Sequence, residues 1–486
     1  MKKIISVVVL LFGIVSFSQS IKVDESLTFS NVGSYKVDGT FFSILNVKNH
    51  KTKKYECLIY TLKDSVSYYI GKFDSDAPQN LELYHRAENN LVLVFSTKER
   101  FYNSTPAYND EQKDYTLFSI NLTSKEANTE KLYLATPTLK FSSKDYSCFV
   151  YIDKEKFEIV TIKDYKKKEK SETVLPNEIV KSYAKTKFKA LTVVSGIGYS
   201  ENIGAPGDRL FYDEDNIYMT YLNPKIRHSL ILKFTRNENK FMWSGYNELP
   251  FGFDKKVKGY NSFLTRDRFY FIAENENQVS FSNVDLKSNV IKNYNLNDLA
   301  RKDTIDKIML TKVILGIGSK NKVPSLTVYK QKGTDNEIVS VSCISRETYY
   351  NDLFQMQFHQ QMMMQQQQMM QQQMQNIKAS IPGGFNVISI PYPFINDKTV
   401  DKKILKFVID SNQQIMKYRG EEFELKKIDY AKDVDLLESY LDNKIDKFKI
   451  KYMSFIRLKN EGLYYAYYDK RKDEIVFGIL KIDESN

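Results

Sequence analysis

Hydrophobic residues along most of this chain fall in short runs, often alternating with polar residues, and polar turns separate the runs. The runs are rich in Val, Ile, Tyr and Phe, which favour strands, whereas the turns contain Asp, Asn or Gly. Alternation with a period of two is typical of half-buried strands. The pattern predicts a mostly-β, antiparallel multi-sheet protein with more strand than the roughly 20–25% found in a typical globular chain.

A degenerate repeat runs through these strands, because a polar turn leads into an apolar strand again and again. The copies are Val37–Ile44, Glu88–Val94, Lys144–Val150, Glu214–Met219, Arg266–Phe271, Asp335–Val339 and Asn460–Tyr465. Most copies start roughly 50 to 70 residues apart, and the last gap is about twice as long, as if a copy near Phe385 were skipped. Repeats of this size predict a β-propeller-like protein with about six to eight blades, other β sandwiches or multi-sheet arrangements being the alternative. Closure of such a ring would bring Leu463–Tyr468 near Phe41–Leu45.

The sequence of one copy can be compared with a known repeat motif. Phe141–Val150 reads FSSKDYSCFV and resembles the phrase that opens a repeat of the WD-repeat-like propellers, in which F-S-x-D-G precedes an apolar inner strand. Here one additional residue precedes Asp145, Tyr146 stands where Gly is expected, and no Trp-Asp dipeptide occurs. The resemblance implies a propeller fold and transfers no site residue.

A second pair of similar segments is Val193–Gly198 and Val313–Gly318, each an apolar run followed by Gly-x-Gly. A phosphate-binding loop would need a third Gly or a G-K-[ST] sequence, and neither is present. We therefore expect each segment to be a strand that ends in a tight turn.

The segment from Gln355 to Gln375 is almost entirely Gln and Met, which both favour helix. Met356, Met363 and Met370 recur at every seventh position and give one narrow apolar stripe. The sequence predicts a projecting helix in an insertion at residues 346–382, which could self-associate or bind a partner helix; disorder is the alternative. A second, shorter helical insertion is expected near residues 429–446. Thioethers can bind Cu(I), but only His359 lies near the Met residues, so we expect no cofactor here.

The start of the chain predicts export. Lys2 and Lys3 precede an apolar run over Ile4–Val15, and small residues follow at cleavage spacing. We expect residues 1–18 to be a signal peptide, cleaved after Ser18 or at latest after Ser20, and a periplasmic or extracellular mature protein. No later apolar run is long enough to span a bilayer. The β repeat body is then expected at residues 19–345 and 383–486, on either side of the insertion.

Charge and cysteine content narrow the function classes. The net charge is +11, but Lys greatly outnumbers Arg, and the densest basic run, Lys163–Lys170, reads as a solvated hairpin loop. We expect no nucleic-acid binding, which favours clustered Arg with interleaved aromatic residues. The three cysteines, Cys57, Cys148 and Cys343, lie in apolar runs and are interpreted as buried thiols, one disulfide being the alternative.

No residue stands out as catalytic, cofactor-binding or metal-binding. The four histidines, His50, His85, His228 and His359, show no zinc-site spacing. The acidic groups at Asp74–Asp76 and Asp213–Asp215 lack the remaining ligands of a calcium loop and are interpreted as turns. The tyrosines and Trp243 could stack on sugars, but core packing explains most of them.

The sequence therefore favours an exported, non-catalytic binding or structural protein of the cell envelope, with an envelope glycan or another envelope protein as partner. The alternative is a glycan-active hydrolase or lyase on a β-propeller scaffold. An enzyme of that kind should place two carboxyl groups roughly 5 to 9.5 Å apart in a Tyr- or Trp-lined cleft. A binding scaffold should instead show an open groove or an apolar patch without such a pair.

Overall fold

The computed structural model describes residues 17–63, 66–97, 113–153, 155–182, 191–195, 208–223, 228–250, 257, 259–265, 268–274, 278–286, 288, 290–318, 322–330, 334–345, 404–419, 450–458 and 462–480. Strands hold 71% of these residues. The mostly-β fold class is thereby confirmed, and the succession of sheets described next is propeller-like. The predicted Gln/Met-rich helix, the helix near 429–446 and most of the expected signal peptide lie outside the described residues.

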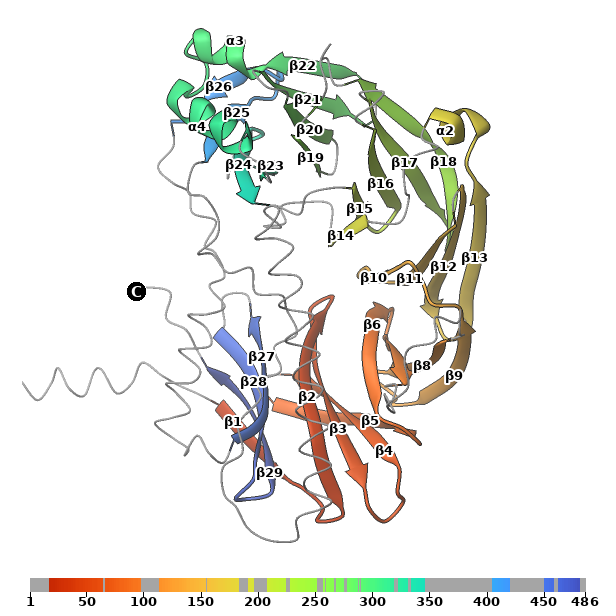
Figure 1. Ribbon diagram of the computed structural model, residues 1–486. Coiled ribbons are helices and arrows are strands. Elements are labelled where there is room, and N and C mark those ends of the chain that lie inside the picture. The colour runs from red at the N-terminus through yellow and green to blue at the C-terminus, as the bar shows by residue number, and fades with distance from the viewer. Residues whose placement is uncertain are drawn as a thin grey trace, which may run out of the picture.

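The described strands form seven sheets, which follow one another along a ring-like arc that is open between the sheet of β23–β26 (residues 322–417) and the sheet of β27–β29 (residues 450–480) (Figure 1). We number the sheets 1 to 7 in chain order. Sheet 1 contains β2 (Leu27–Val37), β3 (Thr40–Asn49), β4 (Tyr55–Lys63) and β5 (Val66–Ser75). Sheet 2 contains β6 (Gln79–Ala87), β7 (Asn90–Thr97), β8 (Lys113–Asn121) and β9 (Ala127–Leu134). Sheet 3 contains β10 (Leu139–Ser142), β11 (Ser147–Asp153), β12 (Lys156–Asp164) and β13 (Lys167–Val174).

The later sheets keep this order, with one additional strand. Sheet 4 contains β14 (Leu191–Ser195), β15 (Asp208–Tyr212), β16 (Asn216–Asn223), β17 (His228–Asn237) and β18 (Lys240–Pro250). Sheet 5 contains β19 (Gly259–Leu264), β20 (Arg268–Glu274), β21 (Val279–Asp285) and β22 (Ile291–Asn295). Sheet 6 contains β23 (Lys322–Lys330), β24 (Glu337–Ser345), β25 (Leu405–Ile409) and β26 (Ile415–Lys417). Neighbouring strands are antiparallel except β14 and β15, which are parallel.

Sheet 7 joins the two ends of the described chain. It contains β27 (Ile450–Leu458), β28 (Gly462–Asp469), β29 (Glu474–Leu480) and the first strand, β1 (Phe17–Lys22), which pairs with β29. The Ser43 hydroxyl on β3 lies 3.2 Å from the Tyr464 hydroxyl on β28. The predicted meeting of Leu463–Tyr468 with Phe41–Leu45 is therefore confirmed.

The predicted repeat corresponds to the sheets. Every copy of the turn-and-strand phrase falls between the first and second strands of a sheet, or of β15 and β16 in sheet 4. The expected skipped copy near Phe385 lies outside the described residues, between β24 and β25 of the same sheet. The number of blades in the whole chain stays a prediction, since residues 346–403 and 420–449 are not described.

Hydrophobic clusters hold neighbouring sheets together. Six clusters of buried residues join sheets 1 and 2, 2 and 3, 3 and 4, 4 and 5, 5 and 6, and 7 and 1. Among the described residues no such cluster joins sheet 6 to sheet 7. The core is thus a series of layers between sheets, and an inner strand that is covered on both faces carries a continuous apolar run, as β7 does from Leu91 to Phe95.

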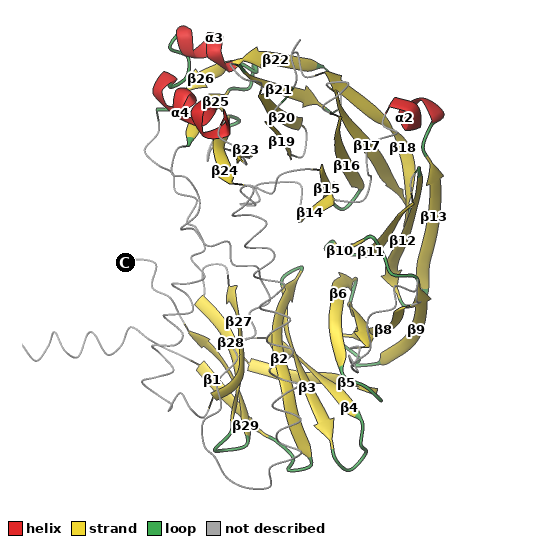
Figure 2. Cartoon of the chain, viewed as in Figure 1, coloured by secondary structure: helices red, strands yellow, loops and turns green. Residues whose placement is uncertain are grey.

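Helices are few in the part of the chain that is described. They are α2 (Asn177–Ser182), α3 (Leu296–Arg301) and α4 (Lys307–Gly318), drawn red in Figure 2. None of them is long and apolar enough to cross a bilayer.

Helix α4 corrects one prediction. Val313–Gly318 is helical rather than a strand that ends in a turn. Leu310 and Val313, three positions apart, are buried on one helix face, and the Asp306 carboxylate accepts a hydrogen bond from the Met309 backbone N–H at 2.9 Å. In the similar segment, Leu191–Ser195 is a strand, and its Gly-x-Gly lies outside the described residues.

Candidate functional site

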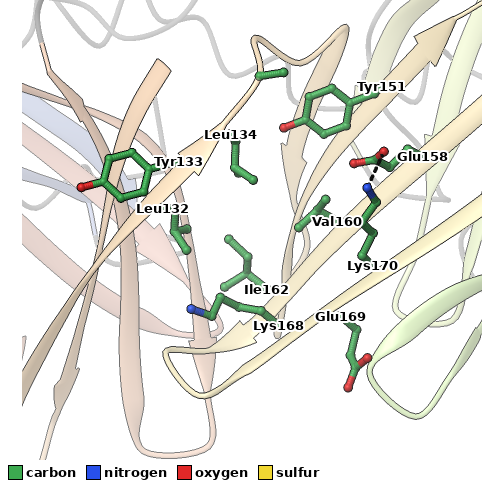
Figure 3. Close-up of a pocket in the computed structure, with 11 residues that line it drawn as sticks. Leu132, Tyr133, Leu134, Tyr151, Glu158, Val160, Ile162, Lys168, Glu169 and Lys170 are labelled. Atoms are coloured by element: carbon green, nitrogen blue, oxygen red, sulfur yellow. Dashed lines mark ion pairs between the residues drawn. The ribbon is translucent and has the colours of Figure 1, made fainter. Parts of the chain in front are cut away.

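A cavity of about 460 Å³ opens between sheets 2 and 3, on the outer side of the ring. It lies beside β9, the last strand of sheet 2, and over β12 and β13, the last two strands of sheet 3. Its lining residues are Leu132, Tyr133, Leu134, Ala135, Tyr151, Glu158, Val160, Ile162, Lys168, Glu169 and Lys170 (Figure 3). We call this cavity the 2/3 pocket.

The floor of the 2/3 pocket is apolar because it continues the core between the two sheets. Leu132 and Ile162 belong to the cluster that joins sheets 2 and 3, and Leu134 and Val160 pack against that cluster. Beneath them the rings of Tyr115 and Phe149 lie 4.9 Å apart, centroid to centroid.

Tyr151 supplies the polar feature of the pocket. Its ring extends from β11, and Figure 3 shows the hydroxyl directed across the cavity toward Leu134 on β9. The hydroxyl oxygen is buried, and it has no hydrogen-bond partner among the described residues. Burial raises the pKa of Tyr151, so the group is a neutral phenol that can donate or accept one hydrogen bond. A buried hydroxyl without a partner costs on the order of 1–3 kcal/mol.

The charged residues around the opening neutralise one another. Lys170 lies 2.8 Å from Glu158, the dashed pair in Figure 3, and 3.0 Å from Glu172. Hydrogen bonds to these two carboxylates raise the pKa of Lys170. Lys168 reaches across to Glu130 on β9 and forms an ion pair with it. The opening is therefore polar but presents no excess of either charge.

The carboxylates of the lining do not face one another. Glu158 is held by Lys170, whereas Glu169 points away from the cavity in Figure 3. The register explains this, because Glu158 pairs with Glu172 and Glu169 pairs with Thr161, on opposite faces of the sheet. The lining contains no pair of facing carboxylates of the kind that a glycoside hydrolase uses.

His85 lies in the same inter-sheet layer, on its inner side, and is fully buried. Its Nδ1 is 2.8 Å from the Ser147 hydroxyl, and its Nε2 is 2.9 Å from the Lys163 carbonyl oxygen. The carbonyl can only accept, so Nε2 carries the proton and Nδ1 accepts from Ser147. Burial lowers the pKa of His85 to about 4. A Ser-His pair that no solvent or substrate reaches serves the packing of the two sheets.

The other residues considered from the sequence do not come together. Cys57 and Cys148 are buried free thiols that form no disulfide with each other, and burial raises the pKa of each to about 12. Asp213 accepts hydrogen bonds from the backbone of Asp215 and Asn216, which is turn chemistry. Among the described residues no group of His, Cys, Asp and Glu could hold a metal ion.

Trp243 and the remaining histidines also have local roles. Trp243 packs edge-on against Phe234 with 5.4 Å between ring centroids, as part of the core between sheets 3 and 4. His50 lies 2.6 Å from the Thr28 hydroxyl, and His228 lies 3.7 Å from Glu248. His359 and the Met-rich segment lie outside the described residues, and of Cys343 only its place on β24 is described.

The pocket lysines were missed as site residues. The sequence places Lys168 and Lys170 in a solvated loop, and a hairpin is indeed present, with its turn at Tyr165 and Lys166. Both lysines lie in β13, however, opposite Ile162 and Val160 on the face that looks toward sheet 2. Alternation of Lys168 and Lys170 around Glu169 was the only signal of a two-sided strand.

Comparison with known proteins gives no family. No protein-family description and no curated protein matches this chain. Solved structures match over about two thirds of it with low similarity. Prolyl oligopeptidase B from Galerina marginata is 8% identical over 66% of this chain and 42% of its own, with a TM-score of 0.31. The WD40 domain of SCAP from fission yeast is 9% identical over 68% and 87%, with a TM-score of 0.26. TolB from Acinetobacter baumannii is 6% identical over 66% and 78%, with a TM-score of 0.20.

Proposed function

We propose that this protein is an exported, non-catalytic binding scaffold of the cell envelope, and that the 2/3 pocket is its binding site. The observation that carries the proposal is the buried Tyr151 hydroxyl, which borders an apolar cavity and has no hydrogen-bond partner among the residues that the structure describes. A ligand with an apolar body and one hydrogen-bonding group would fill the cavity, and a small rotation of the Tyr151 side chain would bring its hydroxyl, which has almost no accessible surface, to that group. The ligand is uncharged, because the lysines at the opening are already paired with carboxylates.

The charge arrangement supports binding rather than glycan cleavage. Catalysis would require a carboxyl group free to transfer a proton and a second one facing it. In the pocket Glu158 is held by Lys170 and Glu169 points away. Export is supported by the apolar run over Ile4–Val15 behind two lysines.

Binding is tested with 4-ethylphenol, a probe with an apolar body and one hydroxyl, by ligand-observed NMR on the full chain. We expect saturable binding by the native protein. Ala135→Trp places a large ring at an exposed lining position and should abolish binding. Val174→Trp, at a site 65% exposed at the end of β13 and outside the lining, is the matched control and should bind normally. Equal binding by both variants would refute the pocket.

Export is tested by mass spectrometry of the protein recovered from its native cells. The proposal expects a new N-terminus after Ser18, or at latest after Ser20. An intact Met1 on the mature protein would contradict it.

A further inference from the structure

Among the described residues, the last strand of each sheet pairs on one side only, and most of these strands carry a feature that discourages pairing with another chain. β5, β13 and β18 are irregular, since the register shifts where β4 meets β5, where β12 meets β13 and where β17 meets β18. β13 is also mostly Lys and Glu, and β18 ends at Pro250. β22 and β26 have five and three residues, and β1 has six.

β9 has none of these features. It has eight residues and pairs with β8 in one unbroken register, from Lys113 opposite Leu134 to Ile120 opposite Ala127. It contains no proline, and of its two charged residues Glu130 is paired with Lys168 across the pocket. Its last three residues, Leu132–Leu134, are uncharged, and Tyr133 is 59% exposed. Among the described outer strands, β9 is the longest with an unprotected edge.

The unprotected edge and the pocket coincide. Leu132 and Leu134 are two positions apart on β9 and both line the 2/3 pocket. A strand laid beside β9 would extend sheet 2, and every second side chain of it would point to the same side as Leu132 and Leu134. Those side chains would enter the pocket, where a backbone or side-chain oxygen could accept a hydrogen bond from Tyr151.

The charge complementarity of the site defines which strand fits. The amines of Lys168 and Lys170 are paired with Glu130 and with Glu158, so a charged side chain brought into the pocket would have no free counterion. An uncharged segment with apolar residues at alternate positions leaves both ion pairs intact. A single-chain lipid or a lone sugar would fill the cavity but would leave the N–H and C=O groups of the β9 edge unpaired.

We propose that the 2/3 pocket binds an extended, uncharged peptide segment of another envelope protein, which pairs with the free edge of β9 and inserts alternate apolar side chains. This inference rests on the proposed binding function and adds the class of partner and the mode of recognition. Main-chain hydrogen bonds to β9 supply affinity, and the pocket selects the side chains.

The probe is a capped, fluorophore-labelled heptapeptide in which valine alternates with threonine, measured by fluorescence anisotropy against the full chain. Two further peptides carry N-methyl groups, one on the odd and one on the even residues. A strand pairs with its neighbour through the N–H groups of alternate residues, so one methylated peptide should bind at least about tenfold more weakly than the parent and the other within about threefold. Ala135→Trp should abolish binding of the parent peptide, and Val174→Trp should not.

Each other result has a defined meaning. Equal affinities of the two methylated peptides would overturn strand pairing at β9. Binding of 4-ethylphenol without binding of the parent peptide would overturn this inference and leave the proposed function standing, whereas failure of both probes would overturn the proposed function itself. Self-association of the native chain in sedimentation velocity that is lost in Ala135→Trp would identify a second copy as the occupant, which also contradicts the inference.

Discussion

Two inter-sheet layers of this protein bury a tyrosine from the second strand of a sheet, and they treat its hydroxyl differently. Between sheets 7 and 1, the Tyr464 hydroxyl lies 3.2 Å from the Ser43 hydroxyl and 3.1 Å from the Ser67 hydroxyl. Ser34 extends this cluster to Ser454 at 2.7 Å. Between sheets 2 and 3, the Tyr151 hydroxyl is buried and has no partner within the described part of the chain.

The difference distinguishes the layer between sheets 7 and 1, which is structural, from the layer between sheets 2 and 3, where we propose a binding site. Polar groups in a dry layer stabilise it only when they are satisfied, and an unsatisfied one lowers stability. The layer between sheets 7 and 1 closes on hydroxyls that lie up to 421 residues apart in the chain. The layer between sheets 2 and 3 is satisfied on its inner side, at His85, and unsatisfied on its outer side, at Tyr151. We propose that a ligand is the partner on that outer side.

The largest expected effect concerns β1, the strand of sheet 7 that comes from the start of the chain. A chain that starts at Val23 lacks β1 and leaves the edge of β29 unpaired, and it loses the hydrogen bond from the Ser67 N–H to Gln19. At roughly 0.5–1 kcal/mol for each lost backbone hydrogen bond, we expect it to be less stable by about 2–4 kcal/mol than a chain that starts at Gln19, the first residue after the expected cleavage at Ser18. Urea denaturation of the two chains measures this. Equal stabilities would show that β1 does not close the ring.

The next effect tests the satisfied side of the layer between sheets 2 and 3. The pKa of His85 is about 4 in the folded chain and ordinarily about 6.5, so the neutral ring stabilises the fold fully above pH 6.5. That stabilisation is lost as the pH falls from 6.5 toward 4, by about 2 kcal/mol between pH 7 and pH 5. Urea denaturation at both pH values gives the loss.

NMR of the imidazole provides the control for this pH dependence. The His85 signals should stay those of a neutral ring down to about pH 5. A midpoint near 6.5 for His85 would contradict the buried hydrogen-bond network.

A smaller effect is expected at Tyr464. Tyr464→Phe removes the hydroxyl and leaves the Ser67 hydroxyl without this partner, while Ser43 keeps its contact with Ser34 at 3.1 Å. We expect a loss of about 1–2 kcal/mol in the free energy of unfolding. Tyr133→Phe, at an exposed tyrosine, is the matched control and should change stability by less than about 0.5 kcal/mol. An unchanged free energy of unfolding in Tyr464→Phe would mean that the hydroxyl cluster does not stabilise the contact between sheets 7 and 1.

The sequence predicted the contact between sheets 7 and 1 better than it predicted the 2/3 pocket. Turn chemistry is local: Asp38 and Gly39 have φ values of 43° and 74°, which Asp and Gly tolerate, so the repeat was visible as a pattern of turns. Closure followed from the repeat, because a ring of sheets must bring its ends together. Helix α4 was missed because its apolar run resembles a strand when read without the capping residue Asp306.

The 2/3 pocket could not be predicted from the sequence, for a different reason. Lys168 and Lys170 read as solvated, and only the register of β12 with β13 places them on the face that looks toward sheet 2. Whether Tyr151 has a partner depends on what sheet 2 presents to it, which no local pattern encodes. The pocket lies between two consecutive sheets and is lined by residues of both, so the sequence of neither repeat alone could reveal it.

The smallest expected change in stability is also the sharpest test of the comparison. Tyr151→Phe makes the same substitution as Tyr464→Phe but removes a hydroxyl that has no partner, so the free energy of unfolding should stay the same or rise by up to about 1 kcal/mol. The same variant should bind 4-ethylphenol about five- to tenfold more weakly, because the ligand loses its one hydrogen bond in the cavity. Urea denaturation and ligand-observed NMR on one preparation give both values. Opposite signs of the two stability changes would establish that the Tyr464 hydroxyl stabilises the packing of sheets 7 and 1, whereas the Tyr151 hydroxyl is available to a ligand. A loss of stability equal to that of Tyr464→Phe would show that the Tyr151 hydroxyl is satisfied in solution, and the assignment of the 2/3 pocket as a binding site would be wrong.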